Sequence, residues 1–142
     1  MANKICTSIE QSKKLMELGI DVNTADMRYG CIAPYDFSDR TYDGGYDEVP
    51  YPKDFLKKNP NFSENEYDGE LPCWSLAALL SVIPKRIKDY NILRIDISDN
   101  DFAIWYDEIG YGVNRELPNI EMKEPVDACV EMILKLKEKN QI

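Results

Sequence analysis

Apolar residues gather most densely in one central run, residues 71–84. This run combines strong helix formers with Pro72 near its start and Pro84 at its end, so it predicts a buried central helix of about twelve residues. Ser75 is an alternative N-cap if the helix begins later. Because a bilayer-spanning helix needs about 20 apolar residues, the run is too short to cross a membrane.

Both ends of the chain also predict helices. Thr7 and Glu10 have the spacing of a capping box and Gly19 suits a left-handed position after a helix, so we expect a helix at residues 8–18. Pro125 suits the first position of a C-terminal helix. The apolar stripe that follows has helical spacing and comprises Val126, Cys129, Val130, Ile133 and Leu134. Since Cys129 belongs to this stripe, we interpret it as a packed thiol.

Residues 91–107 alternate between apolar and polar side chains around a turn cluster, which predicts a β-hairpin. A two-residue turn at 99–100 would pair Ile97 with Phe102, Ile95 with Ile104 and Leu93 with Tyr106. We expect these six side chains to face the helices. On the other face Arg94 would lie opposite Trp105, in position for a cation–π contact. Residues 111–113 indicate a third strand of the same meander.

Residues 21–70 show no clear period. They contain twelve acidic and five basic residues, and so carry most of the chain's net charge of −9. Because a structureless loop of this length is unusual inside a compact domain, we expect short ordered pieces. These are an edge strand at 25–32, ended by Pro34, and one or two helical turns at 52–58. Five tyrosines between 29 and 51 could bury area while keeping their hydroxyl groups in water.

Together these elements predict a single α+β domain over residues 1–142. A small antiparallel sheet would be packed by an N-terminal, a central apolar and a C-terminal amphipathic helix. The acidic, tyrosine-rich segment 21–70 would lie within this domain as a loop-dominated region.

The composition excludes several kinds of catalytic and binding site. The chain has no histidine, which excludes Ser–His–Asp and Cys–His nucleophile pairs and histidine-bound metals within it. The net negative charge argues against binding to nucleic acid or an anionic membrane. The four cysteines show no C-x-x-C spacing and no secretion signal precedes them, so we expect reduced, mostly buried thiols in a cytoplasmic protein. No nucleotide-binding glycine motif occurs, and we expect no cofactor.

The acidic stretch 39–50 partly matches the ligand spacing of a calcium-binding loop. Asp39, Asp43 and Asp47 fall at ligand positions, but Pro50 stands where a bidentate glutamate is needed. We therefore expect no metal site and interpret the stretch as a solvated acidic turn. A metal- or carboxylate-dependent enzyme without histidine, using Asp43 together with residues 107–108, is the alternative function.

Protein binding is the function that the acidic, tyrosine-rich surface favours, because tyrosine is enriched at interfaces and clustered acids steer a basic partner. The candidate binding residues are Trp74, Tyr42, Tyr46, Asp39, Asp43 and Asp47. A purely solvated surface explains the same acids, and a position at the edge of the core is the interpretation favoured for Trp74. The predicted function is thus an intracellular accessory or protein-binding module.

Three stretches resemble a family of small proteins from gut bacteria and their phages or prophages. They are residues 6–21 with 24–27, residues 72–80 (PCWSLAALL) and residues 125–133 (PVDACVEMI). The resemblance covers both ends and the centre of the chain. It implies a single intracellular domain of mobile-element origin, and it transfers neither an activity nor site residues, because the family has no established activity.

Overall fold

The computed structural model describes residues 4–30, 35–36, 41–42, 49–53 and 70–142. Helices and antiparallel strands form the predicted α+β fold, which is confirmed. In chain order the elements are α1 (Ile9–Glu17), the 3₁₀ turn η1 (Val22–Thr24), β1 (Met27–Tyr29), β2 (Tyr35–Asp36), β3 (Thr41–Tyr42), β4 (Tyr51–Pro52), β5 (Leu71–Cys73), α3 (Leu76–Val82), β6 (Arg86–Ile87), β7 (Asn91–Ile97), β8 (Phe102–Glu108), β9 (Gly112–Val113), β10 (Ile120–Met122) and α4 (Pro125–Glu138).

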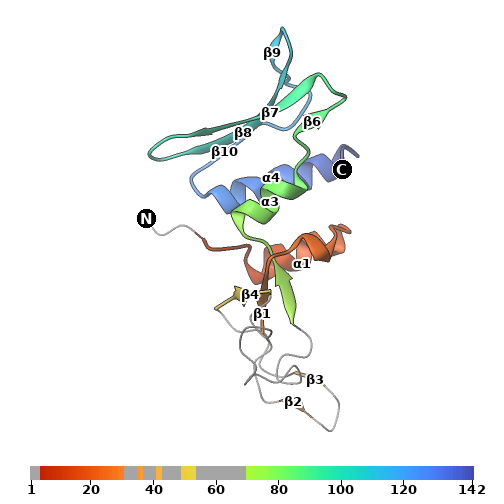
Figure 1. Cartoon of the computed structure of the whole chain (residues 1–142), viewed down its shortest axis with the longest axis vertical. Coiled ribbons are helices and arrows are strands. Elements are labelled where there is room, and N and C mark those ends of the chain that lie inside the picture. The colour runs from red at the N-terminus through yellow and green to blue at the C-terminus, as the bar shows by residue number, and fades with distance from the viewer. Residues whose placement is uncertain (1–3, 31–34, 37–40, 43–48, 54–69) are drawn as a thin grey trace.

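The larger sheet has the strand order β10-β8-β7-β6, and β9 also pairs with β8 (Figure 1). The β7–β8 hairpin has the predicted register, with Ile97 opposite Phe102. The backbone N–H of Ser98 donates to the carbonyl of Asp101 at 2.9 Å and closes the predicted two-residue turn. Strand β9 confirms the third strand expected at residues 111–113.

The predicted inner face of this hairpin is only half covered. Phe102 and Ile104 on β8 are buried, whereas Ile95 and Ile97 on β7 are 40% and 74% exposed. Helix α4 packs on β8 and β10, so the far half of β7 projects beyond the helix. The six apolar side chains thus share one face as predicted, but the helices leave the tip of β7 on that face uncovered.

Helix α4 forms as the sequence predicts, with Pro125 at its first position and Glu124 as N-cap. The Glu124 carboxylate accepts from the backbone N–H of Asp127 at 2.9 Å. The buried residues of the helix are Val126, Ala128, Cys129, Val130, Met132, Ile133 and Leu136. This stripe packs on α3 on one side and on β8 and β10 on another, so α4 is the central element of the core.

Helix α1 begins one residue later than predicted. Ser8 is the N-cap, and a capping box joins it to Gln11 in place of the expected Thr7 and Glu10. The Thr7 hydroxyl is instead shared with Ser12 Oγ at 2.7 Å and with the backbone N–H of Trp74 at 3.1 Å, so it is not free to cap the helix. The end of the helix is as predicted, because Gly19 has a φ of 81°.

The central run divides into a strand and a shorter helix. Residues 71–73 pair with β1 as β5, and α3 begins only after the N-cap Ser75, whose hydroxyl accepts from Ala78 N–H at 3.2 Å. The twelve-residue helix is thus wrong, and the later start at Ser75 is confirmed. Backbone groups need hydrogen-bond partners, and strand β1 supplies them to residues 71–73. A further helical turn is therefore not needed there.

Two further expectations for residues 21–70 are corrected. Strand β1 lies between β4 and β5 in a three-stranded sheet, so it is a central strand and not an edge strand. Residues 51–52 form β4 where helical turns were expected to begin at 52, and the rest of that predicted helical stretch, 54–58, lies outside the described residues. The short strands were missed because three or fewer residues show no measurable alternation.

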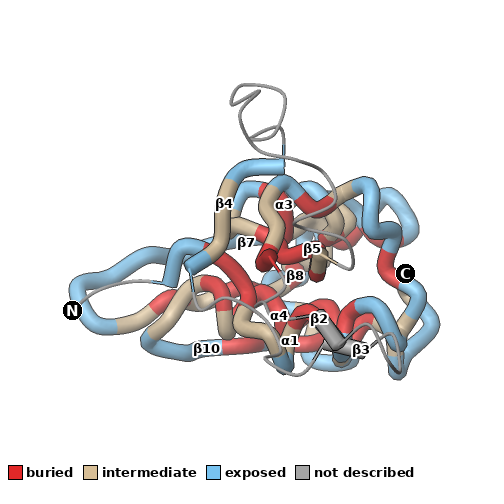
Figure 2. Tube along the Cα trace, turned by 90° about the horizontal axis from the view of Figure 1, so that it is seen from below, coloured by how far each residue is buried: buried red, intermediate tan, exposed pale blue. Residues whose placement is uncertain are grey.

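The main core lies where the helices meet the larger sheet (Figure 2). Its largest fully buried side chains include Trp74, Tyr106 and Phe102. A second, smaller cluster lies between the N-terminal segment and the three-stranded sheet β4-β1-β5. It consists of Cys6, Tyr29, Leu71 and Cys73. Two of the four residues of this cluster are cysteines, which makes it chemically distinct from the main core.

Candidate functional site

Trp74, one of the predicted binding residues, lies in the main core. Its side chain is 0% exposed, and the indole Nε1 donates to Thr24 Oγ1 at 2.9 Å. A side chain without exposed surface offers nothing for a partner to contact. We therefore assign Trp74 to the core, which is the second of the two interpretations that its sequence context allowed.

The other predicted binding residues belong to the acidic, tyrosine-rich segment. Asp39, Asp43, Tyr46 and Asp47 lie outside the described residues. The backbone of Tyr42 lies in β3, opposite Tyr35 in β2. The binding role of these residues and the interpretation of stretch 39–50 as a solvated turn stay predictions.

Of the carboxylates expected to serve the alternative enzyme, the structure describes those at 107 and 108. Asp107 accepts from Trp105 Nε1 at 2.8 Å and forms an ion pair with Arg94 at 3.3 Å on the outer face of the hairpin. Asp43 lies outside the described ranges. Within those ranges no three Cys, Asp or Glu side chains lie close enough together to hold a metal ion.

The chemistry-bearing cluster that the fold assembles is the pair Cys6–Cys73. Cys6 lies on the extended segment before α1 and forms an antiparallel bridge with Ser75, two residues beyond Cys73. The backbone N–H of Thr7 donates to the carbonyl of Trp74 at 2.9 Å, which fixes this register. In an antiparallel pair, residues offset by two positions are diagonal neighbours on the same face. The bridge therefore directs both thiols to one side.

The two sulfur atoms are in contact. Cys6 Sγ lies 3.4 Å from Cys73 Sγ and 3.5 Å from the hydroxyl oxygen of Tyr29. The Tyr29 hydroxyl itself donates to the carbonyl of Thr7 at 2.8 Å. A disulfide has a sulfur–sulfur distance of about 2.05 Å, so the thiols are within about 1.4 Å of bonding distance. The structure holds them as free thiols.

The contact between the two sulfurs makes them unequal acids. Hydrogen bonding by Cys73 lowers the pKa of Cys6 to about 7, and this effect outweighs burial, which acts in the opposite direction. The same contact, together with burial, raises the pKa of Cys73 above its usual range. Burial raises the pKa of Tyr29, so its phenol keeps its proton. Cys6 is thus the more acidic thiol of the pair.

Cys6 is also the cysteine of the pair that lines a pocket. It is 4% exposed and lies at a shallow pocket of about 250 Å³. The pocket is lined by Lys4, Ile5, Cys6, Ser8, Tyr29 and Pro50. Cys73 is 0% exposed and does not line it. A reagent in this pocket therefore meets Cys6 before Cys73. The Lys4 ammonium lowers the pKa of Cys6, and the larger effect of the Asp26 carboxylate opposes it.

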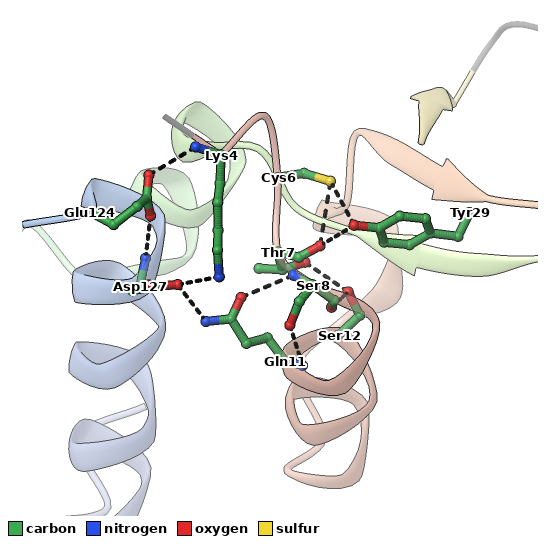
Figure 3. A network of polar contacts seen from close by, with 9 residues as sticks. All are labelled: Lys4, Cys6, Thr7, Ser8, Gln11, Ser12, Tyr29, Glu124 and Asp127. Atoms are coloured by element: carbon green, nitrogen blue, oxygen red, sulfur yellow. Dashed lines mark hydrogen bonds and ion pairs between the residues drawn. The ribbon is translucent and has the colours of Figure 1, made fainter. Parts of the chain in front are cut away.

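Polar contacts fix the N-terminal segment that carries Cys6 (Figure 3). Lys4 Nζ lies 2.7 Å from a carboxylate oxygen of Asp127, and Gln11 Nε2 donates to the same oxygen at 2.8 Å. Burial alone would raise the pKa of Asp127, but the contacts with Lys4 and Gln11 hold it below the usual value. The backbone N–H of Lys4 donates to Glu124 at 3.1 Å. Helix α4 and its N-cap thus anchor the segment through Asp127 and Glu124.

The sequence gives no signal for this pair. Cys6 and Cys73 are 67 positions apart, outside any metal or redox spacing. Burial is confirmed for Cys6, Cys73 and Cys129. The distance between Cys6 and Cys73 in the sequence gave no indication of their contact in space. Cys129 lies in the main core, where burial raises its pKa to about 12. Cys31 lies outside the described residues.

Comparison with known proteins adds no template for this site. No protein-family model, no curated protein and no solved structure matches the chain. None of the helices that the structure describes is long and apolar enough to span a bilayer.

Proposed function

We propose that this chain is an intracellular accessory protein in which Cys6 and Cys73 form a reversible dithiol–disulfide centre. The observation that carries the proposal is the 3.4 Å contact between their sulfur atoms, made by a backbone bridge between two distant segments. Supporting it is the asymmetry of the pair, with Cys6 at a pocket and Cys73 behind it. Attacking and resolving thiols of dithiol proteins are arranged in this way.

The reaction needs a disulfide oxidant, RSSR, of a low-molecular-weight thiol such as glutathione. The Cys6 thiolate attacks one sulfur of RSSR, so that a Cys6–SR bond forms, the RS–SR bond breaks, and the leaving RS⁻ takes the proton that Cys6 released. Cys73 then attacks Cys6 Sγ. The Cys6–Cys73 bond forms, the Cys6–SR bond breaks, and the second RS⁻ takes the proton of Cys73. Two protein thiols are oxidised and one RSSR is reduced to two RSH.

The structure supports this order of steps. The pocket gives a small disulfide access to Cys6 but not to Cys73. The first attacking thiol must be ionised, and Cys6 is the thiol whose pKa is lowered, to about 7. Once Cys6 carries SR it can no longer ionise, so its contact no longer raises the pKa of Cys73. Cys73 needs no access to solvent, because its target is the sulfur that it already contacts. A reducing cytoplasm returns such a pair to thiols, which agrees with the proposed cytoplasmic location.

Alkylation of the thiols by iodoacetamide as a function of pH tests the asymmetry. In the native protein we expect Cys6 to react first, with a rate that is half-maximal near pH 7, because only the thiolate attacks. Replacing the hydrogen-bonding partner, Cys73→Ala, should move this midpoint to higher pH. Peptide mapping by mass spectrometry identifies which cysteine carries the label.

The matched control is Cys129→Ala, which removes another fully buried thiol far from the pair. This variant should leave the pH midpoint of Cys6 unchanged. If Cys6 reacts no faster than Cys129 in the native protein, or if its midpoint stays near the 8.5 of an ordinary thiol, Cys6 is not the attacking group.

Binding of a basic protein partner is a second proposal, and its support is the excess of twelve acidic over five basic residues in segment 21–70. Mobile-element origin is proposed from the family resemblance. Neutralising Asp39, Asp43 and Asp47 to asparagine should abolish capture of a basic host protein that binds the native chain at low salt. Capture that is unchanged by these substitutions would count against an acidic binding surface.

A further inference from the structure

The outer edge of β7 is open over part of its length, and Figure 1 shows the larger sheet on the far side of α3 and α4 from β1. Strand β6 pairs with β7 only at Asn91 and Ile92. Beyond them the backbone N–H of Leu93 donates to the carbonyl of Lys85 at 3.0 Å. In the described part of the chain no strand pairs with the remainder of this edge, residues 94–97.

The direction of the backbone groups along β7 shows which N–H and C=O groups have no partner among the described strands. Ser98 N–H points toward β8, where it meets Asp101, and Leu93 N–H points to the opposite side. Because successive backbone groups of a strand alternate in direction, the N–H and C=O groups of Ile95 and Ile97 point outward with those of Leu93. These two residues also carry exposed apolar side chains. An open edge of this kind is a template for pairing with another strand.

The two ends of the open β7 edge carry side chains of opposite charge. At the β6 end a shallow groove of about 470 Å³ is lined by three cations and three apolar residues, and no carboxylate lines it. They are Lys85, Arg86, Arg94, Ile92, Leu93 and Ile95. At the hairpin tip stand the carboxylates of Asp96, Asp99 and Asp101. An antiparallel partner with the same sequence would place its acidic tip beside this cationic groove.

We propose that β7 pairs antiparallel with β7 of a second copy of this chain, about a two-fold axis at Ile97. This self-association is independent of the thiol chemistry. Each copy presents the same patch, which is the condition for a closed two-fold interface. The pairing buries Ile97 against its symmetry mate and brings the tip carboxylates of each copy to the cationic groove of the other.

Two other positions of the two-fold axis are excluded, which leaves the register centred on Ile97. A two-fold axis at Ile95 would place the partner's Ile97 opposite Leu93, whose edge Lys85 already occupies. An axis at Asp96 would set two carboxylates directly opposite each other, which is destabilising. An axis at Ile97 leaves Lys85 in place and brings Asp99, in the turn that follows β7, alongside Ile95 of the other copy. Ile97 stands at the centre of this pairing. Its backbone N–H and C=O groups point outward, so the two copies can exchange hydrogen bonds there.

Light scattering coupled to size-exclusion chromatography tests this on the full chain. The native protein should approach twice the monomer mass of 16.4 kDa as its concentration rises to about 0.5 mM, and Ile97→Asp should remain at 16.4 kDa throughout. Tyr111→Asp is the control, because Tyr111 is 84% exposed on the connection between β8 and β9, away from the free edge. It should dimerise like the native chain.

A charge exchange tests the proposed contact directly. Lys85→Glu and Asp99→Lys should each weaken the dimer, and the double variant should restore it, because Lys85 of one copy then again meets an opposite charge on the other. A native chain that is monomeric at 0.5 mM would overturn the proposal. Loss of the dimer in Tyr111→Asp but not in Ile97→Asp, or a double variant weaker than both single variants, would also overturn it.

Discussion

Oxidation of the Cys6–Cys73 pair should raise the free energy of unfolding by about 4 kcal/mol, because the disulfide closes a long loop in the unfolded chain. The two cysteines are 67 positions apart, and the cost of closing a loop of that length is removed from folding once the bond exists. The native contact at 3.4 Å means that the folded state needs little rearrangement to accept the bond. Urea unfolding of the oxidised and the reduced protein measures the difference.

The control for this prediction is Cys6→Ser, in which oxidant and reductant should give the same unfolding curve. Cys129→Ser should retain the full difference, because Cys129 lies in the main core and takes no part in the pair. Equal stability of the oxidised and reduced native protein, with the disulfide verified by peptide mapping, would show that the bond strains the folded state by as much as it restricts the unfolded one.

Trp74→Ala should destabilise the protein by about 3–5 kcal/mol, the cost expected when a large buried aromatic side chain is deleted. The indole is 0% exposed, and its Nε1 donates to Thr24, so the substitution opens a cavity and leaves Thr24 without this donor. For a domain of marginal stability this is a large fraction of the total. Thermal or urea unfolding followed by circular dichroism measures the loss.

Trp105→Ala is the matched comparison, since Trp105 lies half-buried on the outer face of the hairpin, where it donates to Asp107. It should cost no more than about 1 kcal/mol. If Trp74→Ala were as mild as Trp105→Ala, the assignment of Trp74 to the core would be contradicted and its role as a surface anchor would return.

Elements whose signal is local could be predicted from the sequence. The α4 helix carries its start signal and its apolar stripe within fifteen residues, and the β7–β8 register follows from a two-residue turn and alternation. The Ser8 cap of α1 was displaced by one position because Thr7 is recruited by Trp74, a contact across the fold. The division of the central run at Ser75 has the same cause, because β5 pairs with the distant strand β1.

The candidate site could not be predicted, because it depends on a register between segments that are far apart in sequence. Cys6 meets Cys73 only because the segment before α1 pairs with the residue at position 75. A shift of that bridge by one residue would turn Cys6 to the other face, and nothing in either segment alone specifies the choice. The free edge of β7 was missed for a related reason. Alternation shows that Ile95 and Ile97 share a face, but not how far a helix extends over it.

Equilibration of the full chain with glutathione at a series of reduced-to-oxidised ratios, followed by acid quenching and peptide mapping, tests the dithiol centre most directly. We expect one reversible transition in which Cys6 and Cys73 become joined while Cys129 stays a thiol. In Cys73→Ser the reaction should stop at a mixed disulfide between glutathione and Cys6. If Cys6 and Cys73 stay thiols across the series, or if both carry glutathione and never join, the centre does not exist.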